Sequence, residues 1–76
     1  MTRHPAVTQV LQWFVFGHLP EGRIRETSAD CAELAEEMAD AFPDGGAELT
    51  VGLRKLLEAK DAFVRCAVAA RKAAAE

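Results

Sequence analysis

The stretch Phe42-Pro43-Asp44-Gly45-Gly46 decides the fold, because it separates two segments whose apolar residues recur at helical spacing. Proline cannot continue a helix, and an Asp-Gly-Gly run is typical of a turn. The connection is too short to let the two flanking helices point the same way. We therefore expect these helices to pack antiparallel, as a helical hairpin.

The spacing of apolar residues predicts three helices and no strand. The predicted helices cover residues 5–17, 28–42 and 48–71. Pro5 suits a first helical turn, and the hydroxyl of Thr27 or Ser28 suits the N-cap of the second helix. Apolar and polar residues nowhere alternate over a useful length, so no strand is expected. The predicted fold is all-α, a short N-terminal helix followed by the hairpin, in one domain over residues 1–76.

Composition excludes several classes of protein. The chain has 76 residues, of which 50% are hydrophobic and 28% are charged, and its formal net charge is -3. Its apolar runs are far shorter than the ~20 residues of a membrane span, and its charge disfavours binding to duplex nucleic acid. No basic-then-apolar segment occurs, so we expect no secretory signal, and Cys31 and Cys66 are unclustered. We expect a cytoplasmic protein with no disulfide framework and no membrane partner.

A chain of this length buries little surface on its own. Below about 80 residues a core seldom offsets the conformational entropy lost on folding, ~1.5 kcal/mol per residue, unless disulfides, metals or oligomerisation contribute. Neither disulfides nor metals are expected here. We therefore predict a homo-oligomer whose interfaces carry the function.

Charge is segregated along the chain. From Glu26 to Glu48 there are eight acidic residues and no basic one, whereas Leu49 to Glu76 hold six basic and three acidic residues. Mutual neutralisation between the paired helices is one interpretation of this pattern. Lys60 stands apart, because it falls inside the apolar stripe that marks the expected buried face of the last helix. The members of this stripe are Leu49, Leu53, Leu56, Leu57, Phe63, Val64 and Ala67. Lys60 is either a lysine that reaches solvent or an ion pair, or an anion site at a subunit interface.

Aromatic and basic residues cluster between the first two predicted helices. Trp13, Phe14 and Phe16 point in different directions on one helix, so all three cannot face the same core. Aromatic rings stack on nucleobases and arginines bind phosphates, which makes this segment a candidate nucleotide site. Packing into the core is the alternative. The polar members of the cluster are His18, Arg23 and Arg25.

Catalytic motifs are absent from the sequence. It contains no Ser-His-Asp or Cys-His arrangement of recognisable spacing, no glycine-rich phosphate loop and no HExxH motif. The acidic residues of the second predicted helix are spread around it without a histidine beside them, which favours a solvated face over a metal site. We expect no enzyme, no metal and no cofactor.

Two elements of the chain are distinctive in combination. They are Trp13-Phe14-Val15-Phe16-Gly17-His18-Leu19-Pro20 and Leu53-Arg54-Lys55-Leu56-Leu57-Glu58-Ala59-Lys60-Asp61. With the helix start at Ser28, the Phe42-Pro43-Asp44-Gly45 turn and Val64-Arg65, the chain resembles a family of small phage proteins from about residue 10 to about residue 67. These are the phage cyclic-nucleotide sponges, the anti-CBASS and anti-Thoeris helical-hairpin family.

The resemblance implies a compact homohexamer of helical hairpins without catalytic activity. It implies that the protein binds cyclic oligonucleotide messengers of bacterial immune cyclases, in the cytoplasm of the host bacterium, and withholds them from their effectors. Family members hold cyclic dinucleotides and cyclic trinucleotides in separate pockets, and some relatives bind the cyclic ADP-ribose-type signal of Thoeris. A tyrosine commonly follows the Trp-Phe pair in the family. Phe16 stands in that region here, so stacking is kept without a hydroxyl contact.

Symmetry explains how so small a chain could build such pockets. A cyclic dinucleotide has two phosphates about a two-fold axis, a cyclic trinucleotide has three about a three-fold axis, and a dihedral hexamer has both axes. The residues expected to line the base pocket are Trp13, Phe16 and His18. Those expected to hold phosphates are Arg23, Arg25 and the helix start at Thr27 and Ser28. Those expected to charge the second pocket are Arg54, Lys55, Lys60 and Arg65.

Two other functions stay open. A helical-hairpin module that binds a protein and no small ligand is supported by the apolar stripes and the acidic second helix. A small nucleic-acid binder of the helix-turn-helix type is disfavoured by the same acidic helix.

Overall fold

The computed structural model describes residues 3–75. Three helices follow one another: α1 from Pro5 to Leu11, α2 from Arg23 to Ala41 and α3 from Gly46 to Ala75. No strand occurs among the described residues, which confirms the prediction of an all-α fold. Residues 1, 2 and 76, which the predicted domain includes, lie outside the described range.

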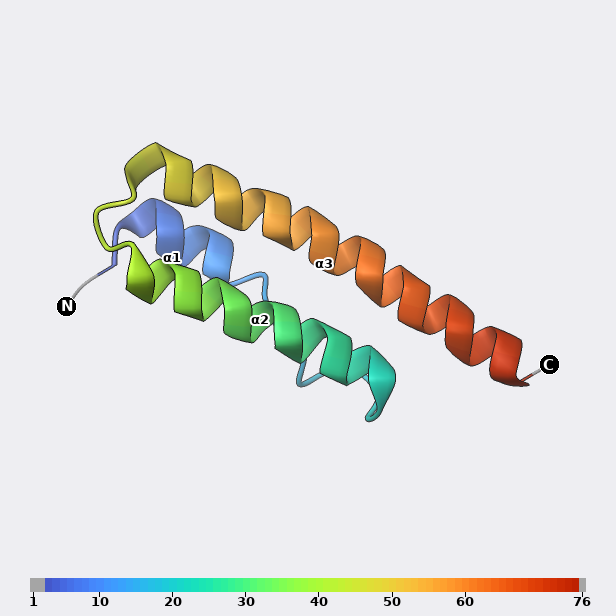
Figure 1. Cartoon of the computed structure of the whole chain (residues 1–76). Coiled ribbons are helices and arrows are strands. Elements are labelled where there is room, and N and C mark those ends of the chain that lie inside the picture. The colour runs from blue at the N-terminus through green and yellow to red at the C-terminus, as the bar shows by residue number, and fades with distance from the viewer. Residues whose placement is uncertain (1–2, 76) are drawn as a thin grey trace.

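The three helices form an elongated bundle of 48 × 19 × 17 Å. α2 and α3 lie side by side and run in opposite directions, as the colours in Figure 1 show. α1 contacts both of them close to the turn that joins them. The connection between α1 and α2 then continues along the bundle, away from this turn, to the start of α2 at the other end (Figure 1). One broad side of the α2/α3 pair is therefore left without a third helix.

α1 is shorter than the predicted helix over residues 5–17. Pro5 occupies the first turn, as expected, but the helix ends at Leu11. Residues 12–20 form turns and irregular backbone instead. The physical reason is that side chains of α2 and α3 bind backbone carbonyl oxygens of this segment, so they compete with the N–H groups of a continuing helix.

α2 begins at Arg23 rather than at residue 28, so the predicted start is wrong. The hydroxyls of Thr27 and Ser28 lie inside the helix and do not cap it, since Thr27 donates to the carbonyl oxygen of Arg23 at 2.7 Å. Arginine, isoleucine and glutamate are adequate helix formers, which lets the helix extend into the predicted linker. Gly22 precedes it with a φ of 105°, a left-handed conformation that glycine adopts readily.

The turn between α2 and α3 lies where the Pro-Asp-Gly-Gly stretch predicts it. α2 ends at Ala41, one residue before the predicted end, and residues 42–45 form the connection. Gly45 packs so closely on α3 that a Cβ there would lie 2.6 Å from the Cβ of Leu49. Glycine is therefore required by the close approach of the turn to the helix.

α3 is longer at both ends than the predicted helix over residues 48–71. Its 30 residues run from Gly46 to Ala75 and correspond to a length of about 45 Å. The alanine-rich tail continues the helix because alanine is the strongest helix former. Within residues 3–75, no helix is both long and apolar enough to cross a membrane.

A small core lies where the three helices meet. Its buried members are Val7, Val10, Phe14, Ala32, Ala35, Ala39 and Leu53. Leu53 is the largest fully buried apolar side chain, and the members from α2 are all alanine, which lets the neighbouring helices approach closely. A core of such small side chains gives the single chain a thin margin of stability.

Candidate functional site

The segment of residues 12–20, which we call the aromatic segment, is fixed to the hairpin by hydrogen bonds to four of its carbonyl oxygens. The acceptors are the carbonyl oxygens of Trp13, Val15, Gly17 and Leu19. The donors are the side chains of Ser28 and Arg25 in α2 and of Lys60 in α3. Every second carbonyl thus points to the hairpin. The aromatic segment consequently presents its rings from a fixed backbone.

Arg25 makes the shortest of these hydrogen bonds. Its Nε donates to the carbonyl oxygen of Leu19 at 3.0 Å, and its Nη2 donates to the same oxygen at 2.8 Å. Nη2 also reaches the carbonyl oxygen of Gly17 at 3.3 Å, and Nη1 lies 3.6 Å from the carboxylate of Glu21. The guanidinium that the sequence assigns to a phosphate is engaged by the protein's own backbone.

Ser28 also has a structural contact where the sequence predicts a ligand contact. Its side chain is fully buried, and Oγ donates to the carbonyl oxygen of Val15 at 3.2 Å. Because α2 begins at Arg23, Ser28 stands in the second turn and not at a helix N-terminus. The expectation that it offers a hydroxyl at the helix start is therefore wrong.

Lys60 lies beneath the aromatic segment. Its side chain is only 12% exposed, and Nζ lies 3.1 Å from a carboxylate oxygen of Asp61. The same nitrogen donates to the carbonyl oxygen of Trp13 at 3.5 Å. Of the two interpretations of this lysine, these contacts agree with the ion-paired one, in which the aliphatic stem stays inside the apolar stripe.

The aromatic rings of the segment divide between core and surface. Phe14 is buried, whereas Trp13 is 59% exposed and Phe16 is also exposed. This division agrees with the prediction that the three rings cannot share one core. His18 is exposed as well. The three residues predicted to contact a base therefore belong to one fixed surface segment.

A hollow between the first turns of α2 and the later turns of α3 brings together groups suited to a nucleotide. We call it the α2-start hollow, and its volume is about 410 Å³. Arg23, Thr27 and Phe63 line it and supply a guanidinium, a hydroxyl and an aromatic ring. The remaining lining residues are Asp30, Cys31, Cys66, Ala67 and Ala70. An adjoining hollow of about 270 Å³ is lined by Arg23 and Arg71, so two guanidinium groups flank this end of the molecule.

The electrostatics of the α2-start hollow are mixed. Arg23 is 75% exposed and lies 3.7 Å from the carboxylate of Glu26. Such an exposed ion pair contributes little to stability. The N-terminus of α2 adds partial positive charge, because no side chain caps it. Asp30 contributes a negative charge on the wall. Burial, and secondarily the Asp30 carboxylate, raise the pKa of the Cys31 thiol, so this thiol is neutral at physiological pH.

Phe63 and Arg71 are the lining residues that the sequence did not single out. The apolar spacing of the last helix assigns Phe63 to its buried face, yet the ring is 56% exposed. It belongs to the part of the stripe that neither α1 nor the aromatic segment covers. The helical spacing could have pointed to Arg71. It lies one turn beyond Ala67 on α3, so the two residues share a side of the helix, and both line the adjoining hollow.

The second predicted set of cations does not form one cluster in a single chain. Arg54, Lys55 and Arg65 are exposed on α3, and Lys60 is covered by the aromatic segment. Lys55 lies 3.5 Å from the carboxylate of its neighbour Glu58. Arg54 and Lys55 are adjacent in a helix and therefore point to different sides of it. Within one copy, Arg54, Lys55 and Arg65 are therefore dispersed over the exposed surface of α3.

The acidic residues of α2 and the basic residues of α3 do not pair with one another within residues 3–75. The carboxylates of Glu36 and Asp40 on α2 instead lie 2.6 Å and 2.7 Å from the guanidinium of Arg3. Hydrogen bonds to these two carboxylates raise the pKa of Arg3. Neutralisation between the paired helices, one interpretation of the charge segregation, is not what the structure shows.

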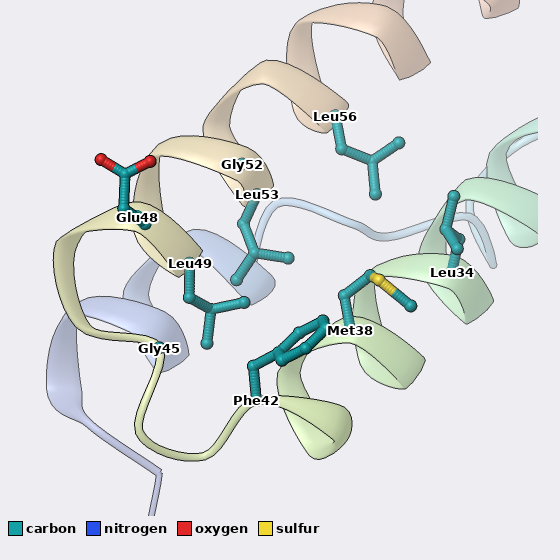
Figure 2. A pocket seen from close by; sticks show the side chains of 9 residues that line it. All are labelled: Leu34, Met38, Phe42, Gly45, Glu48, Leu49, Gly52, Leu53 and Leu56. Atoms are coloured by element: carbon teal, nitrogen blue, oxygen red, sulfur yellow. The ribbon is translucent and has the colours of Figure 1, made fainter.

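An open apolar groove runs between α2 and α3 on the side away from α1. Figure 2 shows Leu34 and Met38 of α2, and Phe42 directly after it, directed toward side chains of α3, with the α1 ribbon behind them. The α3 residues that they approach are Leu49, Leu53 and Leu56. The groove has a volume of about 480 Å³ and no basic residue in its lining.

The described part of the chain offers no group of three or more His, Cys, Asp or Glu side chains able to hold a metal ion. Comparison with known proteins gives no relative: no protein-family model matches the chain, and no curated protein or solved structure is significantly similar to it.

Proposed function

We propose that this chain is a non-catalytic sponge that binds cyclic oligonucleotide messengers of bacterial immunity, withholds them from their effectors and so blocks CBASS-type anti-phage signalling. One structural observation carries the proposal: Arg23, Thr27 and Phe63 line the same hollow. The Arg23 guanidinium can bind a phosphate and the Phe63 ring can stack on a base, whereas the Thr27 hydroxyl donates its proton to the carbonyl oxygen of Arg23. The resemblance of the sequence to the phage sponges supplies the ligand class.

The α2-start hollow is large enough for part of such a ligand. Its volume of about 410 Å³ falls in the range of small-molecule sites, but the hollow is open to solvent. Arg23 extends toward a neighbouring hollow that Arg71 also lines. One chain therefore supplies one aromatic ring and two guanidinium groups, which suits one nucleotide unit of a ring-shaped messenger.

A whole cyclic messenger would be held between copies of the chain. A homohexamer is our proposed assembly, because a cyclic dinucleotide fits a two-fold axis and a cyclic trinucleotide fits a three-fold axis. Each cation near an axis is then present two or three times, which offsets the formal net charge of -3 on one chain. Arg54, Lys55 and Arg65, which are dispersed in one copy, become neighbours of other copies in this way.

Isothermal titration with cyclic dinucleotides and cyclic trinucleotides tests the proposal. We expect sub-micromolar dissociation constants, and we expect chromatography after long incubation to recover the ligand intact. A chain that binds neither ligand class, or that hydrolyses the ligand, would contradict the proposal. The proposed place of action is the cytoplasm of the host bacterium.

The open apolar groove favours a second candidate, a helical-hairpin module that binds another protein and no small ligand. The ratio of absorbance at 260 nm to that at 280 nm in freshly purified protein separates the two candidates. The chain has one tryptophan and no tyrosine, so a bound nucleotide changes this ratio strongly. A ratio that one tryptophan alone explains would favour the protein-binding module.

A further inference from the structure

A stripe of apolar and small residues runs along the side of α3 that α1 leaves open. Its residues follow one another at alternating spacings of four and three: Gly52, Leu56, Ala59, Phe63, Cys66 and Ala70. A parallel stripe on α2 has the same spacing: Thr27, Cys31, Leu34, Met38 and Ala41. This spacing keeps residues on one side of a helix and is typical of helices that pack lengthwise against other helices. We call the two stripes together the open face.

The open face extends along the whole α2/α3 pair. The apolar groove occupies the end near the turn, and the α2-start hollow occupies the other end. Large apolar side chains on it remain in contact with solvent, since Leu34 is 43% exposed and Phe63 is 56% exposed. Figure 2 shows that α1 lies behind this face and does not cover it.

The chain exposes more surface than a compact monomer of its mass, and the excess is about the area that one partner contributes to a protein interface. The accessible surface is 5395 Å², whereas a compact monomer of 8.2 kDa exposes about 4,500 Å². The excess of about 900 Å² is close to the ~800 Å² that each partner contributes to a stable protein interface. One additional layer of helices would therefore bring the chain to an ordinary degree of burial.

We infer that a second copy of this chain covers the open face, with α2 of each copy lying over α3 of the other. The charges at the rim favour this orientation. Asp30, Glu33 and Glu37 of α2 are exposed and have no ion pair within residues 3–75, and Lys55 is exposed beside the α3 stripe. Packing α2 on α2 would bring these carboxylates together, whereas packing α2 on α3 places them near a cation.

The orientation also sets the register between the copies. Met38 and Leu53 line the same part of the groove, so Glu37 and Lys55 stand at about the same level of the two helices. A two-fold axis parallel to the helices exchanges α2 and α3 without shifting this level. Glu37 of one copy then faces Lys55 of the other. The assembly is an antiparallel four-helix bundle of two layers, held by the apolar stripes and aligned by this charge pair.

A consequence concerns the α2-start hollow. With the axis parallel to the helices, equivalent ends of the two copies meet, so their two hollows face each other. Packing α2 on α2 would place the two hollows at opposite ends of the pair. The role of the joined hollows in ligand binding rests on the proposed function. The pairing of the copies itself does not depend on a ligand.

Sedimentation equilibrium of the ligand-free full chain tests the pairing. We expect the wild-type chain to sediment at an even multiple of 8.2 kDa. Leu34→Asp should raise the dissociation constant by about thirtyfold or more, because it places a charge in the middle of the apolar contact. Val51→Asp is the matched control, because Val51 is 49% exposed but lines a surface that His4 and Ala6 share, outside the open face. Far-UV circular dichroism checks that both variants keep their helices.

A charge exchange tests the orientation. Glu37→Lys and Lys55→Glu should each weaken the pairing about tenfold, and the double variant should return to near the wild-type value. A wild-type monomer at tens of micromolar, or equal effects of Leu34→Asp and Val51→Asp, would assign the open face to a different partner and overturn the inference. Tighter association of Glu37→Lys alone would mean that α2 lies on α2, which also overturns it. None of these outcomes depends on nucleotide binding.

Discussion

The guanidinium of Arg25 donates two hydrogen bonds to the carbonyl oxygen of Leu19, from Nε at 3.0 Å and from Nη2 at 2.8 Å. This contact ties the end of the aromatic segment to α2. Arg23, two residues earlier on the same helix, is 75% exposed and lines the α2-start hollow. The sequence presents the two arginines as equivalent candidates for a phosphate. In the structure Arg25 binds backbone carbonyl oxygens, whereas Arg23 stays accessible to a ligand.

We predict that Arg25→Ala destabilises the fold more than Arg23→Ala does. Arg25→Ala should lower the free energy of unfolding by about 1–2 kcal/mol, since it removes charged hydrogen bonds that are partly exposed. Arg23→Ala should change the same quantity by less than about 0.5 kcal/mol. Urea denaturation followed by circular dichroism measures both values. Equal destabilisation by the two variants would mean that the contact with Leu19 does not stabilise the aromatic segment.

We predict that the stability of the fold falls both when the hydroxyl of Ser28 is removed and when its side chain is made larger. Ser28→Ala should lower the free energy of unfolding by about 1 kcal/mol, because the partly buried hydrogen bond to the carbonyl oxygen of Val15 is lost. Ser28→Leu should cost about 3 kcal/mol or more, because the site is fully buried and has no room for a larger side chain. Thr27→Ala serves as the control, since the Thr27 hydroxyl bonds only to its own helix at the carbonyl of Arg23. Thermal denaturation ranks the stabilities of the three variants. A Ser28→Leu variant as stable as the wild type would contradict the burial of Ser28 beneath the aromatic segment.

Ligand affinity should depend on Arg23 and Phe63, which both line the α2-start hollow. We predict that Arg23→Ala and Phe63→Leu each weaken cyclic-dinucleotide binding about tenfold, through loss of a phosphate contact and of a stacked ring respectively. Lys72→Ala, which removes an exposed positive charge from the last turn of α3, should have little effect. Titration calorimetry gives the three affinities. A loss of similar size in Lys72→Ala would point to the overall charge of the protein and not to the hollow.

The two cysteines should react with Ellman's reagent at different rates. Cys66 is exposed and should react first, whereas Cys31 is half-buried and its pKa is raised by burial. Only the thiolate reacts, so the raised pKa moves the increase in the rate of Cys31 toward higher pH. Cys66→Ser should abolish the fast phase and leave the slow one. Both cysteines belong to the open face, so if a second copy covers it, Leu34→Asp should accelerate the reaction of both and leave Cys66 the faster of the two.

Short-range features of the chain predicted much of the architecture. The Pro-Asp-Gly-Gly stretch placed the turn of residues 42–45, and helical spacing placed α3. The start of α2 and the end of α1 were not predictable in this way. The capping preference of Ser28 is a local rule, but the hydroxyl is taken by the carbonyl of Val15, thirteen residues away. A contact of that kind exists only once the chain has folded back.

In the candidate site, too, local patterns predicted some features, and contacts between residues distant in sequence decided the others. The prediction that Trp13, Phe14 and Phe16 do not share one core is confirmed, but its premise of one continuous helix is wrong, because α1 ends at Leu11. Phe63 was assigned to the buried face because it continues the stripe of Leu53, yet Leu53 is buried and Phe63 is exposed. The difference arises because α1 and the aromatic segment cover only one side of the α2/α3 pair.

Three helices and the sharp turn between the longer two follow from the amino-acid sequence alone, because turn and helix preferences act between residues that are close in the chain. Which cations stay accessible and which bind backbone carbonyls was decided only by the tertiary structure. Arg25, Ser28 and Lys60 meet the aromatic segment through the path of the connection between α1 and α2. Burial and hydrogen-bond partners depend on neighbours that are distant in sequence, and spacing along a single helix carries no information about them.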